Sequence, residues 1–216
     1  MHSKNHSKLR LAVLLIAAAF CCTPSAAFAQ EPVQLPAPQM TGGQPLMQAL
    51  AQRRTTRAFR DQALPMQTLS NLLWAAFGVN RSRDVKPGLG RTAPSAMNRQ
   101  EVELYVVLAQ GVFVYDAEAN RLQPVAAGDA RSKVGSGDAA HAAVTIVYVA
   151  DPKLPFAQVD TGFIGQNVYL FAASEGLNAW FYALHGPQET AAVAAALHLA
   201  DQKAPLYAQS VGYPVQ

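Results

Sequence analysis

Cysteine is almost absent from this chain of 216 residues, and its two copies, Cys21 and Cys22, both lie near the N-terminus. Residues 1–29 have the features of a secretory signal peptide: a basic start, the apolar run LAVLLIAAAF, and the small residues AFA before Gln30. The run is too short to span a bilayer, so we expect cleavage and no stable membrane anchor, with uncleaved anchoring as the alternative. The exported protein, periplasmic or secreted, would then have no thiol, no disulfide and no cysteine-ligated metal.

Histidine is also scarce, since only His141, His185 and His198 follow the predicted signal peptide. The three are scattered and none has metal-ligand spacing or an HExxH-like helix, so we expect no metal site. Ser95 and Ser210 lack the glycine-flanked turn that exposes a hydrolase nucleophile. These absences exclude the commonest hydrolytic chemistries.

Charged side chains make up only 14% of the chain, and they are unevenly placed. Without residues 1–29 the basic and acidic side chains balance at fourteen each. Arg53 to Arg99 nevertheless holds nine basic and two acidic residues, whereas Gln100 to the end holds five and eleven. A short basic segment in a neutral protein predicts one localised anion rather than a nucleic acid, which needs a wide positive face.

The pattern of apolar residues predicts one domain of class α+β over residues 46–216, which is what this length allows. Residues 30–45, with four prolines and two glycines, are expected to form a linker or extended arm, either mobile or lying across another surface. Helical spacing covers 46–54, 65–79, 160–177 and 187–199, and β patterns cover 102–109, 111–125, 142–151, 179–184 and 204–215. The broad apolar coverage of 160–177 predicts a helix buried on more than one side.

The stretch QRRTTRAF, Gln52 to Phe59, concentrates three arginines and two threonines between two predicted helices. Guanidinium groups offer forked donors that match phosphate oxygens, and a threonine hydroxyl adds a shorter donor to the same anion. The stretch is therefore the candidate anion site. The alternative is that these are surface arginines favoured by the dipole at a helix C-terminus.

Five segments in order carry a family resemblance: RRTTRAF, LPMQTLSNLLWAAFGV, RTAPSAMNRQEVELYVV, DTGFIGQNVYLFAASEGLNAW and SVGYP. From about Leu46 to the end, the chain resembles the nitroreductase superfamily of FMN-dependent oxidoreductases, most closely its azoline-oxidising dehydrogenase branch. The resemblance implies a nitroreductase-like fold with a central, mainly antiparallel sheet flanked by helices. It also implies a homodimer that binds FMN at its interface, with contacts from both subunits.

The same resemblance implies an FMN site made by ten residues: Arg53, Arg54, Thr55, Arg57, Ser95, Asn98, Arg99, Gln166, Ala183 and Leu184. The first four would hold the phosphate. Ser95 and Asn98 would meet the polar pyrimidine edge, although a lone asparagine is usually a turn or cap residue, and Arg99 would reach the flavin or the phosphate. The amide of Gln166, surrounded by apolar residues, would touch the cofactor or join the subunits. The backbone N–H of Ala183 or Leu184 would meet flavin N5.

Two departures from the family pattern bear on function. The C-terminal VGYPVQ has no Lys or Arg to complete the phosphate site, and the bulky Trp180, Phe181 and Tyr182 put substrate access in doubt. We expect an exported oxidoreductase that passes hydride through flavin N5 to or from a small nitro, quinone or azoline-like molecule. Export also means that FMN is acquired outside the cytoplasm or that the electron donor differs from NAD(P)H. The alternative is a non-catalytic dimer that binds another ligand or partner in the flavin cleft.

Overall fold

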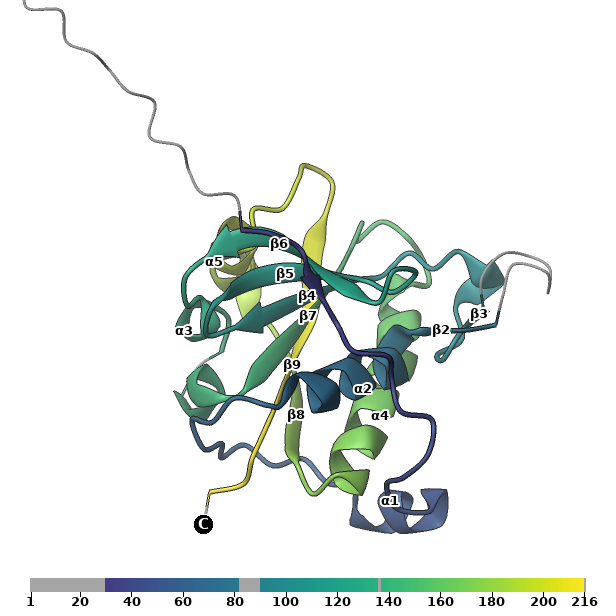
Figure 1. Ribbon diagram of the computed structural model, residues 1–216. Coiled ribbons are helices and arrows are strands. Elements are labelled where there is room, and N and C mark those ends of the chain that lie inside the picture. The colour runs from purple at the N-terminus through teal and green to yellow at the C-terminus, as the bar shows by residue number, and fades with distance from the viewer. Residues whose placement is uncertain (1–29, 82–89, 136, 216) are drawn as a thin grey trace, which may run out of the picture.

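The computed structural model describes residues 30–81, 90–135 and 137–215. The predicted signal peptide, residues 1–29, lies outside the described residues. A seven-stranded sheet in the order β1-β6-β5-β4-β7-β9-β8 organises the described chain, and every neighbouring pair in it is antiparallel (Figure 1). Its strands are β1 (Val33–Gln34), β4 (Glu103–Leu108), β5 (Gly111–Asp116), β6 (Arg121–Ala127), β7 (Val144–Ala150), β8 (Asn178–Ala183) and β9 (Ala204–Gly212).

Helices cover both faces of this sheet. One face packs against α2 (Met66–Phe77) and α4 (Ala157–Ser174), and α1 (Leu46–Gln52) contacts α4. The short α3 (Arg131–Val134) and α5 (Gly186–Ala196) lie against the other face. The remaining elements are the ribbon of β2 (Val79–Arg81) with β3 (Gly90–Arg91) and the 3-10 turns η1 (Ala96–Asn98) and η2 (Gly137–His141). The α+β class and the mainly antiparallel sheet flanked by helices are thereby confirmed.

Residue alternation explains why the sheet has a core on each side. Leu104 and Val106 of β4 belong to the core beneath α2 and α4, whereas Tyr105 and Val107 belong to the core beneath α3 and α5. Successive strand residues point to opposite faces, so an apolar run of this kind fits a strand covered on both sides. Strand β7 is buried along all seven residues, as its β-branched sequence predicts for a central strand.

The arm, residues 30–45, is extended and lies across the rest of the fold. Val33 pairs with Leu122 of β6, so the arm adds the edge strand β1 to the sheet. It then crosses α2, where Ser70 Oγ donates a hydrogen bond of 2.6 Å to the carbonyl of Pro36. Near its end, Gln44 N donates to Ser174 Oγ of α4 at 2.6 Å. The arm thus ties the edge of the sheet to both large helices.

Helix α4 differs from its predicted burial. Asp160, Ile164 and Val168 face the interior, but Val159 and Phe163 are 53% and 45% exposed. The exposed residues of this helix all lie between 158 and 166, whereas residues 167–174 are buried or partly buried, so its apolar surface near the N-terminal end has no cover within the described chain. Leu46, Met47 and Leu50 of α1 are also exposed. Among the described helices, none combines the length and apolar character needed to cross a membrane.

Candidate functional site

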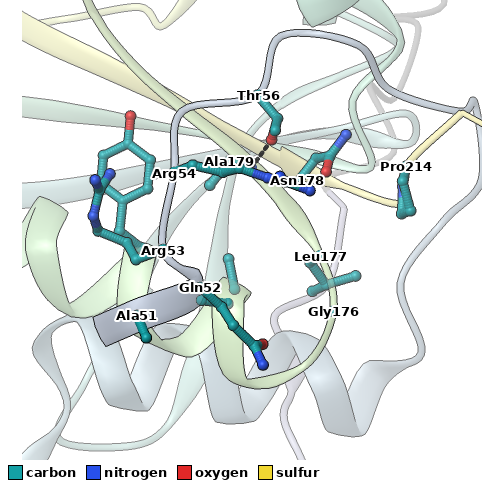
Figure 2. A pocket seen from close by; sticks show the side chains of 13 residues that line it. Ala51, Gln52, Arg53, Arg54, Thr56, Gly176, Leu177, Asn178, Ala179 and Pro214 are labelled. Atoms are coloured by element: carbon teal, nitrogen blue, oxygen red, sulfur yellow. Dashed lines mark hydrogen bonds between the residues drawn. The ribbon is translucent and has the colours of Figure 1, made fainter. Parts of the chain in front are cut away.

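A cavity of about 510 Å³ lies between the end of α1, the C-terminal half of α4 and the start of β8 (Figure 2). Helix α1 ends at Gln52, and the extended chain after it carries Arg53 and Arg54 into the cavity wall. The wall contains the following residues: Ala51, Gln52, Arg53, Arg54, Thr56, Tyr169, Ala172, Ala173, Gly176, Leu177, Asn178, Ala179 and Pro214. The side of the cavity next to α1 therefore carries positive charge. The side formed by α4 and β8 carries mainly small residues and the amide of Asn178.

Hydrogen bonds fix the segment Arg53–Phe59, here called the arginine loop, along the outer edge of β8. Thr56 N donates to Ala179 O at 2.9 Å, and Ala179 N donates to Thr56 Oγ1 at 3.1 Å. Asn178 Nδ2 donates to Ala58 O at 2.7 Å. The loop and β8 each donate hydrogen bonds to the other, so the start of this edge strand is paired and the loop is held in place.

The arginines of this loop rest on aromatic rings. The guanidinium carbon of Arg53 lies 5.4 Å from the centroid of the Tyr169 ring, and that of Arg57 lies 5.3 Å from the Trp180 ring. Such cation–π contacts hold a guanidinium without neutralising it. Within the described parts of the chain, no acidic side chain forms an ion pair with Arg53, Arg54 or Arg57. Their charge therefore remains available to an anion.

Tyr169 connects this loop to α4 and β8, and the sequence did not single it out. Its hydroxyl lies 2.9 Å from Thr55 Oγ1 and accepts a hydrogen bond of 2.8 Å from Phe181 N. The available signal was the tyrosine itself, since the hydroxyl of a tyrosine that packs in a fold usually has a partner. Its partner in the arginine loop, however, lies 114 residues away in the sequence.

The second predicted segment, Ser95 to Arg99, is organised by a buried carboxylate. Asp160, only 2% exposed, accepts hydrogen bonds from Ser95 Oγ at 2.8 Å and from Ala96 N at 3.1 Å. Asn98 has a φ of 52° and its Oδ1 accepts from Gln100 Nε2 at 2.8 Å, as in the turn role left open above. Arg99 forms an ion pair of 3.4 Å with Glu101.

The arginine loop and the segment Ser95 to Arg99 do not meet within one chain. Ser95 is bound at the first turn of α4 through Asp160, and Thr55 is bound nine residues further along through Tyr169. At 1.5 Å per residue, these two anchor points are about 14 Å apart along the helix. A ligand that met both segments of one chain would have to span at least that length.

The remaining predicted residues lie further out. Gln166 is exposed on α4 and does not line the cavity, so its predicted role, to touch the cofactor or to join the subunits, stays a prediction. Ala183 is exposed at the end of β8, five residues beyond Asn178 and about 17 Å along the strand. Leu184 packs against the core beneath α5.

The aromatic run of β8 is mostly packed inside the fold. Phe181 points to α4, where a Cβ at Gly165 would lie 2.8 Å from its ring. Tyr182 points to the opposite face, its hydroxyl lies 3.2 Å from Ser210 Oγ, and burial raises its pKa, which keeps the phenol neutral. Of the three, Trp180 is the one that contacts the arginine loop. In the described chain, no group of three His, Cys, Asp or Glu side chains could hold a metal ion.

Comparison with known proteins identifies the family of this chain. The sequence pattern of the Nitroreductase family matches residues 50–213. The chain belongs to the nitroreductase family. A solved structure of a Ralstonia eutropha protein described as a nitroreductase superposes with a TM-score of 0.78 at 33% identity, over 89% of this chain and 94% of that one.

Two further nitroreductase relatives are more distant. A Methanocaldococcus jannaschii protein named as a nitroreductase is 28% identical over 153 residues, which are 61% of this chain and 75% of the relative. A structure of a Clostridium difficile protein described as an FMN-dependent nitroreductase is 18% identical, with a TM-score of 0.54 over 79% of this chain and 88% of that one, and shows a shared fold. The predicted family is thus confirmed, and its membership supports an oxidoreductase. The azoline-oxidising branch stays a prediction, because none of these three is described in such terms.

Proposed function

We propose that this nitroreductase-family chain is an exported, FMN-dependent oxidoreductase acting on a small organic molecule of nitro, quinone or azoline-like type. The observation that supports this proposal best is the arginine loop: Arg53 and Arg54 line a cavity of about 510 Å³, and none of the three loop arginines forms an ion pair with an acidic side chain in the described chain. This volume is within the usual range for small-molecule sites. The family relatives support FMN as the ligand.

The donor set fits a flavin mononucleotide at one end. Arg53 and Arg54 supply forked, permanently charged donors from the cavity wall. Thr55 lies outside that wall, but its exposed hydroxyl is 2.9 Å from Tyr169, which does line the cavity, and would add a donor at its rim. Arg57 extends the positive charge along β8 from its place over Trp180. Together these side chains would hold the phosphate, and the C-terminal segment adds the uncharged Pro214 to the cavity wall.

The far end of β8 would meet the ring system. Ala183 is the last paired residue of β8, opposite Tyr207, and its backbone N–H or that of Leu184 would meet flavin N5. When bound, the flavin supplies the hydride chemistry at N5, and the protein supplies binding and orientation. No conspicuous acid, base or nucleophile is required for that role.

The proposed site is completed by a second copy of the chain. Val159 and Phe163 of α4 and Leu46, Met47 and Leu50 of α1 are exposed apolar side chains of the kind that dimers cover. A homodimer would also explain why Ser95 and Asn98 lie away from the arginine loop of their own chain. Light scattering should report a dimer for the unsubstituted protein and a monomer for Phe163→Glu; a monomeric unsubstituted protein would remove the interface site.

An absorbance spectrum tests the proposed function directly. Residues 30–216 would be incubated with FMN, freed of unbound flavin and scanned for the oxidised-flavin band near ~450 nm. Stoichiometric retained flavin supports the oxidoreductase, and candidate donors and acceptors can then be screened by bleaching and recolouring. A colourless protein would instead favour the second candidate, a non-catalytic dimer with another anion in the cavity, which the absence of a C-terminal base favours.

A further inference from the structure

We infer that Tyr169 is a positioning residue that turns the Thr55 hydroxyl into a donor for the flavin phosphate and holds Arg53 beside it. The inference rests on the proposed function, because it concerns how the same cavity would recognise the phosphate of FMN. Tyr169 lines the cavity from α4 and contacts three segments at once: the arginine loop, its own helix and β8.

The direction of the hydrogen bonds follows from what each group can donate. Phe181 N–H can only donate, so Tyr169 Oη accepts at 2.8 Å and keeps its own hydrogen for another partner. Thr55 Oγ1 is 2.9 Å away and can accept that hydrogen. A phenol is a stronger donor than an aliphatic hydroxyl, because its ring stabilises charge on the oxygen, so the chain runs from Phe181 through Tyr169 to Thr55.

The consequence falls on Thr55. A hydroxyl has a single hydrogen, and if Thr55 gave it to Tyr169 none would remain for an anion. With Tyr169 as the donor, the Thr55 hydrogen is free to point into solvent or to a phosphate oxygen, and Thr55 is exposed on the loop. Hydrogen bonds aligned in one chain also polarise one another, which strengthens the terminal donor.

The ring of Tyr169 has a second effect. It lies under the Arg53 guanidinium at 5.4 Å, so the residue that orients the threonine also supports the neighbouring arginine. Tyr169 is fixed in turn by helix α4, whose adjacent Val168 and nearby Ala172 are buried. Donors held by a rigid element lose less freedom when a ligand binds, which is how a supporting residue raises affinity without touching the ligand.

Comparing FMN with riboflavin, which lacks the phosphate, tests this inference. Both flavins would be titrated into the unsubstituted protein and Tyr169→Phe while flavin fluorescence is followed. We expect the FMN dissociation constant to rise about 5- to 10-fold in Tyr169→Phe, the equivalent of one hydrogen bond, and the riboflavin constant to change less than about 2-fold. Tyr169→Leu, which also removes the ring under Arg53, should weaken FMN binding further.

Thr55→Val provides an independent test, because Thr55 is exposed and its replacement does not disturb the core. If Tyr169 acts through Thr55, Tyr169→Phe should add little to the FMN loss already caused by Thr55→Val. Tyr207→Phe is the matched control, since Tyr207 packs on the same Phe181 with ring centroids 5.1 Å apart but lies outside the cavity wall. Melting temperatures would confirm that each variant is folded.

The outcomes separate the inference from the function on which it rests. Equal losses for FMN and riboflavin, unchanged FMN binding in Tyr169→Phe, or fully additive losses with Thr55→Val would overturn the role of Tyr169 alone. Failure of the unsubstituted protein to bind either flavin would overturn the proposed function, and this inference with it.

Discussion

The arginines of the arginine loop and Arg131 of α3 place the same guanidinium group in opposite surroundings. Arg53 and Arg57 rest on aromatic rings, and Arg53 lines the cavity. Arg131, in contrast, is only 8% exposed and donates to Asp129, Asp61 and the carbonyl of Ala142. The hydrogen bond from Arg131 to Asp129 raises the pKa of the guanidinium. Arg131, which joins parts of the fold, is surrounded by oxygen acceptors. Arg53 and Arg57 contact only aromatic rings in this respect, so their positive charge is not paired and can bind an anionic ligand.

Removing the loop arginines should have the largest effect, a loss of FMN affinity with little change in stability. Arg53→Ala combined with Arg57→Ala is expected to raise the FMN dissociation constant at least ~100-fold, because two charge-assisted hydrogen-bond donors are lost. The melting temperature should stay nearly constant, since neither side chain forms an ion pair within the described chain. Fluorescence titration measures the first quantity and thermal unfolding the second.

The corresponding lysine variant serves as the control for the loop. Arg53→Lys with Arg57→Lys keeps the charge but removes the planar fork, so its affinity for FMN should lie between those of the other two proteins. Binding that is unchanged in the alanine variant would refute the phosphate assignment and return these residues to the role of surface arginines at a helix end.

Arg131→Met should have the opposite signature. Its loss removes the guanidinium donor from the Ala142 carbonyl and from the carboxylates of Asp61 and Asp129. We therefore expect the free energy of unfolding to fall by about 2 kcal/mol with FMN affinity preserved. Urea denaturation measures the change. Arg121→Met is a suitable control, because the side chain of Arg121 is 42% exposed, against 10% for Arg131, and its ion pair with Asp116 should contribute less than about 1 kcal/mol. Equal effects of the two substitutions would contradict the structural role of Arg131.

Local sequence patterns predicted much of this fold. Pro65 and Gly78 mark the two ends of α2, and the β pattern of residues 111–125 corresponds to strands β5 and β6. Each of these features depends on neighbours in sequence. Strand β1 was not predicted, because two residues in a proline-rich arm become a strand only through pairing with β6.

The candidate site was predictable where residue type alone carries the chemistry. The density of arginines was visible in Gln52 to Phe59, and the loop does border a cavity. The supporting residues were not visible, since Tyr169 and Asp160 act through bonds to chain segments more than sixty residues away. The exposure of Gln166 was also hidden, because a helix with apolar residues all round does not reveal which side the sheet will cover.

The smallest effect that we expect is the pH dependence of the stability that the ion pair of Asp129 with Arg131 contributes. The hydrogen bond from Arg131 lowers the pKa of Asp129, so this carboxylate stabilises the folded state above its unfolded pKa of about 3.9, and the stabilisation is lost as pH falls through the lower folded value. Asp129 is 45% exposed, and solvent screening should keep the cost of Asp129→Asn below about 1 kcal/mol at pH 7. Urea denaturation at several pH values should show this cost shrinking below about pH 4.

The loop variant Arg53→Ala with Arg57→Ala should show no such acid-dependent change in unfolding free energy, because no carboxylate of the described chain is paired with those arginines. A cost of Asp129→Asn that persisted unchanged at low pH would mean that the ion pair with Arg131 is not its source.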